Sequence, residues 1–127
     1  MITQNLLEKA RQALSSAKLL LESGDSNGAC NRAYYAMFDA ARFALLKSDS
    51  PVHAEVARSH SGLITAFSLH LVKTGKVSVE LGKSLNKVED MRLIADYRGD
   101  SIEPSDADWV VNQADVFVNE ILTKFSV

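Results

Sequence analysis

The sequence predicts an all-α protein built as a helical bundle. Apolar residues recur at spacings of three and four along five segments of the 127-residue chain, and no segment alternates apolar and polar side chains over the length of a strand. Capping residues and glycines lie between these segments, where helix ends are expected. With 46% hydrophobic residues, the chain can form one core and is too short for two ordinary domains. We therefore expect a single domain over residues 1–127.

The first two helices are predicted from their ends and their apolar stripes. Asn5 followed by Glu8 resembles a capping box, and Ser23-Gly24 is a typical stop, so the first helix should lie between them. Asp25 or Ser26 can cap the second helix, which should run to about Lys47. Its apolar residues cover about half of the circumference, more than a surface helix needs. The second helix is therefore either central or part of a dimer interface.

Three further helices follow a break over residues 48–58. Ser59 or Ser61 can begin the third helix, which should run to Val72 and stop at Lys73-Thr74-Gly75. Ser78 should open a fourth helix that ends near Arg98-Gly99. Pro104 and the acidic residues after it predict the start of a fifth, which carries its apolar stripe to Phe125.

Composition and motifs exclude several classes of protein. The net charge of −2 does not favour a domain whose whole surface binds nucleic acid. The three histidines, His53, His60 and His70, lack the one-turn spacing of a metal site, and no phosphate loop or nucleophile elbow is present. We expect neither metal nor cofactor. No leader or membrane-spanning apolar stretch is visible, so a cytoplasmic protein is expected, with Cys30 as a small core residue in a reducing compartment.

The most informative residue is an arginine within the apolar stripe of the fourth helix. Five residues share that face: Leu81, Leu85, Val88, Arg92 and Ala95. A buried charge is costly unless it is paired, and Asp96 lies one turn later as a counter-charge. Two interpretations stay open at this point. Arg92 and Asp96 form a structural ion pair, or they form a phosphate site together with Tyr97 and Arg98 near an open end of the bundle.

A second candidate group opens the third helix. Arg58 and His60 lie next to Ser61-Gly62, where unpaired backbone N–H groups and the positive end of the helix dipole favour an anion. The plain alternative is that His60 only helps to cap the helix. His70, between Leu69 and Leu71, is expected to be a core histidine.

Four segments together resemble the HEPN domain family. They are residues 32–42, 58–64, 67–75 and 92–98. The resemblance extends from about Asn27 to Ile121. It implies a four-helix up-and-down bundle with an additional short or C-terminal helix, a homodimer, and a toxin–antitoxin pair with a minimal nucleotidyltransferase as partner.

Active HEPN proteins are metal-independent endoribonucleases with an Arg followed by a His after four to six residues. Arg92 matches that arginine, but Tyr97 follows after four residues and no histidine follows Arg92. A phenol with a pKa of about 10 is a poor general base at neutral pH. We therefore expect a degenerate ribonuclease motif, and a module that binds a nucleotide, RNA or the nucleotidyltransferase through Arg92, Asp96, Tyr97, Arg98 and the Arg58–His60 turn.

Two alternatives belong to other classes. One is a ribonuclease toxin in which Arg92 stabilises the scissile phosphate and His60 moves the proton. The other is a structural interaction protein whose wide apolar second helix binds a partner.

Overall fold

The computed structural model describes residues 2–48, 59–98 and 101–125, with side chains for residues 4–48, 59–94 and 101–125. Within these ranges the regular structure is entirely helical, which confirms the all-α prediction. The elements in chain order are α1 (Ile2–Glu22), α2 (Ser26–Lys47), α3 (His60–Phe67), the π-helical segment η2 (Ser68–Val72), α4 (Val79–Arg98) and α5 (Pro104–Phe125).

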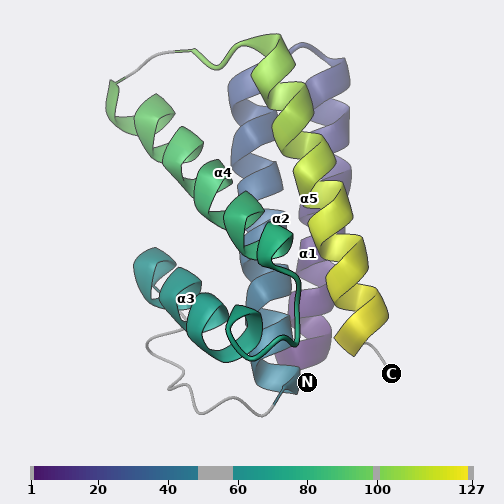
Figure 1. The fold of residues 1–127 in the computed structure, drawn as a ribbon. Helices are drawn as coiled ribbons and strands as arrows, with labels where there is room; N and C mark the ends of the chain where they lie inside the picture. Colours follow the sequence, from purple (N-terminus) through teal and green to yellow (C-terminus); the bar gives the residue numbers. More distant parts are fainter. Residues whose placement is uncertain (1, 49–58, 99–100, 126–127) are drawn as a thin grey trace.

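The four long helices run alternately up and down. In Figure 1, α1 rises from the N-terminus, α2 returns beside it, α4 rises again at a slant, and α5 descends to the C-terminus. The additional helix is α3, which lies below α4 in this view. This is the expected four-helix bundle with one extra helix.

Helix α2 is the centre of the bundle. It packs against α1, α3, α4 and α5. Alanines on one side of α2 are buried and allow close approach of neighbouring helices: Ala29, Ala33, Ala36, Ala40 and Ala44. The wide apolar arc of α2 is thus used inside the chain, and of the two sequence-based interpretations the structure supports the central position.

The predicted caps explain most helix ends. The carboxylate of Asp25 accepts a hydrogen bond from the backbone N–H of Gly28 at 2.8 Å, and the hydroxyl of Ser59 accepts one from Gly62 at 3.0 Å. Gly24 and Gly75 adopt φ values of +88° and +78°, two residues after the end of α1 and three residues after the end of η2. The predicted start of the first helix at Asn5 is wrong, because α1 already begins at Ile2. Neither glycine nor proline precedes Asn5 to interrupt the helix.

The third predicted helix reaches Val72 as expected, but its last five residues form a π turn. The backbone N–H of Lys73 donates to the carbonyl of Ser68 at 2.9 Å, five residues earlier. A π turn changes the direction in which the following side chains point. His70 is accordingly part-exposed instead of lying in the core, whereas Leu71 is fully buried.

None of the described helices combines the length and the apolar character needed to span a bilayer.

Candidate functional site

The guanidinium of Arg92 points into the bundle, as the apolar stripe predicted. Its side chain is only 14% exposed. Leu81, Leu85 and Val88 of the same face are buried. Arg92 therefore lies among apolar neighbours and needs a nearby negative charge.

Glu89, one turn before Arg92 on α4, supplies that charge. Nη2 of Arg92 lies 3.1 Å from Oε1 of Glu89, and Nε donates to Oε2 at 3.4 Å. The Glu89 side chain is 11% exposed, so both charges are largely removed from water. Sequence reasoning missed this partner and named Asp96, whose side chain lies outside the described residues. The signal was present, because residues three apart share a helix face.

Tyr34 of α2 packs against the guanidinium of this ion pair. The phenol is fully buried, and Cζ of Arg92 lies 4.7 Å from the centre of its ring, a cation–π distance. Burial raises the pKa of Tyr34 above its ordinary value, and the nearby negative charge of Glu89 raises it further. Tyr34 therefore stays a neutral phenol. The sequence indicated only an apolar role for it, although a buried phenol usually has a hydrogen-bond partner.

His60, in the first turn of α3, completes the group. Its Nδ1 shares a hydrogen bond of 2.5 Å with the hydroxyl of Tyr34 and lies 3.8 Å from Oε2 of Glu89. The ring packs against the rings of Tyr34 and Phe38, with centroids 5.3 and 4.9 Å away. At 36% exposure, the His60 side chain is the part of the group most open to solvent.

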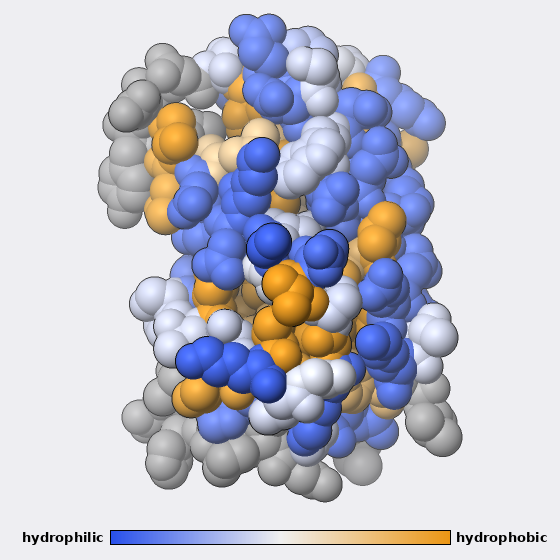
Figure 2. All heavy atoms as spheres, viewed as in Figure 1, coloured by the Kyte–Doolittle hydropathy of each residue, from blue (hydrophilic) through white to orange (hydrophobic). Residues whose placement is uncertain are grey.

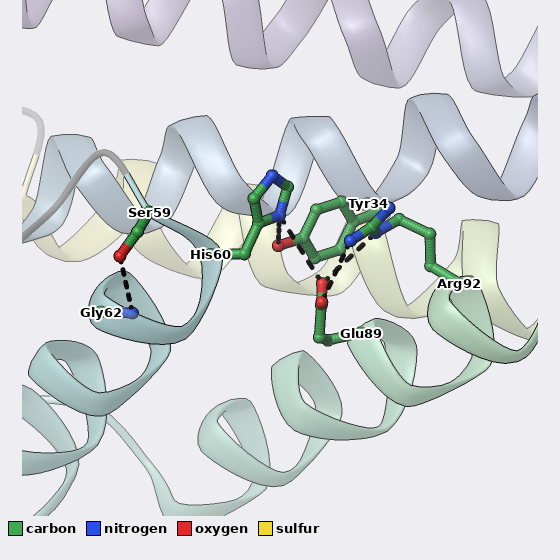
Figure 3. A network of polar contacts seen from close by, with 6 residues as sticks. All are labelled: Tyr34, Ser59, His60, Gly62, Glu89 and Arg92. Atoms are coloured by element: carbon green, nitrogen blue, oxygen red, sulfur yellow. Dashed lines mark hydrogen bonds and ion pairs between the residues drawn. The ribbon is translucent and has the colours of Figure 1, made fainter. Parts of the chain in front are cut away.

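We call Tyr34, His60, Glu89 and Arg92 the Glu89 cluster. Figure 3 shows side chains from α2, α3 and α4 converging on the Glu89 carboxylate. Nε2 of His60 is turned away from the other three side chains in this view. The sequence suggested a site near an open end of the bundle. The structure instead places the cluster on the side of the bundle, because Tyr34 lies well inside α2.

The other predicted site residues are less defined. Asp96, Tyr97 and Arg98 belong to the last turns of α4, but their side chains lie outside the described residues. Arg58 lies outside them altogether. The structure therefore brings together Arg92 and His60, and the contribution of the other four residues stays a prediction.

The cluster combines a fixed cation with groups that can exchange protons. A guanidinium binds oxyanions, and the two ring nitrogens of an imidazole can accept and donate a proton. Among the side chains that the structure describes, no three His, Cys, Asp or Glu residues gather as a metal site would require. The arrangement suits binding of an oxyanion such as phosphate, and proton transfer beside it.

Comparison with known proteins places the chain in a family. The family model of the HEPN domain matches residues 3–124. A protein of Methanocaldococcus jannaschii that carries the name "Putative toxin" is 34% identical over 119 residues, which cover 93% of this chain and 84% of that protein. A UPF0332 protein of Thermotoga maritima is 37% identical over 116 residues, with 89% and 83% covered, and one of Gloeobacter violaceus is 34% identical over 96 residues, with 76% and 72% covered. The chain therefore belongs to the HEPN domain family.

Proposed function

We propose that this chain is a toxin-like HEPN module that binds single-stranded RNA, and that the Glu89 cluster receives a phosphate of the RNA backbone. The observation that carries the proposal is that Arg92 and His60, from two different helices, both face the carboxylate of Glu89. Carboxylate and phosphate are both oxyanions, and guanidinium binds both. A relative bearing the name of a toxin supports the toxin-like setting.

An RNA phosphate would reach the Glu89 cluster past the side chain of His60. The exposure of its side chain, 36%, exceeds the 11% of Glu89 and the 14% of Arg92. The space-filling view shows the surface indented between α3 and α4 (Figure 2). An RNA phosphate would therefore meet His60 first and approach Arg92 from that side. Arg58, Asp96, Tyr97 and Arg98 are proposed to extend the site around this opening.

Fluorescence anisotropy with a short labelled single-stranded RNA tests the proposal. We expect Arg92→Met and His60→Gln each to weaken binding about tenfold, the equivalent of about 1.4 kcal/mol. Arg32→Met removes the same charge from an exposed position on α2, and His70→Gln removes the other described histidine. Both controls should change the Kd less than twofold.

Circular dichroism must show that each variant keeps its helices. His60→Gln matters most here, because His60 is part-exposed and its loss should disturb folding least. If folded Arg92→Met and His60→Gln bind RNA as tightly as the wild type, or if the controls lose as much affinity, the Glu89 cluster is not the RNA site.

The partner belongs to the same proposal. We propose that a minimal nucleotidyltransferase neutralises the module as its antitoxin. Co-expression should give a complex that co-purifies and that lowers RNA binding. A nucleotidyltransferase encoded in the neighbouring gene that forms no such complex would contradict this pairing.

A metal-independent ribonuclease is the second candidate, and the position of His60 favours it. We propose His60 as the spatial substitute for the missing histidine of the motif, because it lies 3.8 Å from Glu89, which binds Arg92. In such a reaction His60 would transfer the proton while Arg92 stabilises the charge on the phosphate. The wild type should cleave single-stranded RNA in the presence of a chelator. His60→Ala should abolish this cleavage, and a 2′-deoxy substrate should not be cleaved. Binding without cleavage would exclude this candidate and leave the binding module.

A further inference from the structure

The carboxylate of Glu89 lies where a phosphate bound to Arg92 would have to lie. Nη2 of Arg92 donates to Oε1 at 3.1 Å and Nε donates to Oε2 at 3.4 Å. Each nitrogen meets a different oxygen, which is the two-bond arrangement by which a guanidinium also binds a phosphate. The Nε–Nη2 edge of Arg92 is therefore already occupied by a side chain of the same helix.

His60 faces the same carboxylate from α3. Its Nδ1 lies 3.8 Å from Oε2 of Glu89, and Figure 3 shows dashed contacts from the carboxylate to both the imidazole and the guanidinium. The Glu89 side chain is only 11% exposed, so water screens its charge poorly. Two anions on one guanidinium edge would repel each other strongly in this position. A phosphate can therefore bind Nε and Nη2 of Arg92 only after the Glu89 carboxylate has left them.

We propose that Glu89 is an internal inhibitor of the RNA site, whose carboxylate takes the place of an RNA phosphate until it is displaced. This inference rests on the proposed function and concerns the control of that same site. The chain would have a closed state, with Glu89 on Arg92 as the structure shows, and an open state that binds RNA. The measured Kd then equals the Kd of the open state divided by the fraction of open chains.

The displaced side chain of Glu89 has an exposed place nearby. Asn86, one turn earlier on α4, lines a groove of about 660 Å³ between η2 and α4. Residues three apart lie about 60° from each other around a helix, and helical side chains lean toward the N-terminus of their helix. A change of rotamer would therefore move the Glu89 carboxylate toward Asn86 and the groove, where water can hydrate its charge.

The alternative role for Glu89 is to hold Arg92 in the direction that RNA binding requires. The two roles predict effects of opposite sign. Removal of an inhibitor strengthens RNA binding, because Arg92 is left with an unpaired charge that the phosphate can neutralise. Removal of a positioning residue weakens RNA binding in the same direction as Arg92→Met.

Fluorescence anisotropy with the labelled single-stranded RNA separates these roles. Glu89→Gln keeps the shape of the side chain and removes its charge, and we expect it to lower the Kd about tenfold, which corresponds to about one open chain in ten. The new amide of Gln could itself donate to a phosphate. Glu89→Ala lacks that amide, so a similar gain in this variant would assign the effect to the loss of the carboxylate.

Asp90→Asn is the matched control. It removes one negative charge at the next residue of α4, where the side chain is exposed, and should change the Kd less than twofold. Added salt screens exposed charges far more than buried ones. At higher salt the ratio of the wild-type Kd to the Glu89→Gln Kd should therefore persist, whereas any effect of Asp90→Asn should shrink. Circular dichroism must show that all three variants keep their helices.

NMR of the carboxyl carbons follows the displacement itself in the wild type. On titration with the RNA, the side-chain carboxyl resonance of Glu89 should shift with the Kd of binding, and that of Asp90 should not. Weaker or unchanged RNA binding by Glu89→Gln and Glu89→Ala, an equal gain in Asp90→Asn, or an unshifted Glu89 resonance would each overturn the inhibitor. If Arg92→Met and His60→Gln still weaken binding in that case, the RNA site stands without it. If they do not, the RNA site and its inhibitor are both refuted.

Discussion

Arg92 and Glu89 should be coupled energetically, and a double-mutant cycle can measure the coupling. Arg92→Met keeps the length of the side chain but leaves the Glu89 carboxylate, 11% exposed, without its guanidinium. Breaking a fully buried pair costs about 3–5 kcal/mol, so this less buried one should lose about 2–3 kcal/mol of unfolding free energy. Glu89→Gln keeps the shape and leaves Arg92 unneutralised, with a loss of about 1–2 kcal/mol.

The double variant shows whether Arg92 and Glu89 stabilise the fold as a pair or independently. Arg92→Met with Glu89→Gln removes both charges together and leaves no uncompensated ion, so we expect a loss of only about 1–2 kcal/mol. The coupling energy would then be about 2 kcal/mol, as for residues in direct contact. Urea unfolding followed by circular dichroism and by the fluorescence of Trp109 gives the four stabilities. A double variant that loses the sum of the two single losses would refute the ion pair as the structure places it.

Three further perturbations test other parts of the structure. Burial raises the pKa of Cys30 from 9.0 to about 11, so a thiol reagent at pH 8 should modify Cys30 only after unfolding. The neutral thiol contributes stability below pH 9 that is lost as the pH rises toward 11, and Cys30→Ala should reduce that alkaline loss in pH-dependent melts. Tyr34→Phe removes the hydroxyl that His60 contacts, and should cost about 1–2 kcal/mol in urea unfolding; no loss would mean that the hydrogen bond is not maintained. Gly75→Ala places a side chain at φ +78° and should lower the free energy of unfolding by about 1 kcal/mol, measured by thermal unfolding. Gly62→Ala inside α3 is the control, because Gly62 lies in helical backbone and its substitution creates no such strain.

The sequence predicts the helices well because their ends are encoded locally. The hydrogen bonds that Asp25 and Ser59 accept, and the positive φ of Gly24 and Gly75, depend on residues no more than four positions away. The inward direction of Arg92 follows from helical periodicity alone. These features need no knowledge of how the helices pack.

The composition of the site is harder to predict because it depends on contacts between helices. Tyr34 and His60 are far apart in sequence, and nothing local indicates that the phenol of α2 lies beside the first turn of α3. The three-residue spacing of Glu89 and Arg92 is a local signal, but only the packing of α4 against α2 and α3 shows that both charges are largely buried. The π turn at Ser68–Val72 has no clear sequence signal, and it redirects His70 away from the core.

The central claim is that Arg92 and His60 belong to one RNA site, and NMR of the two side chains tests it most directly. On titration with a short single-stranded RNA, we expect the imidazole resonances of His60 and the Nε–H resonance of Arg92 to shift together with one Kd. The resonances of His70 and Arg32 should stay in place. Shifts confined to His70 or Arg32, or unchanged resonances of His60 and Arg92 at RNA saturation, would contradict the account.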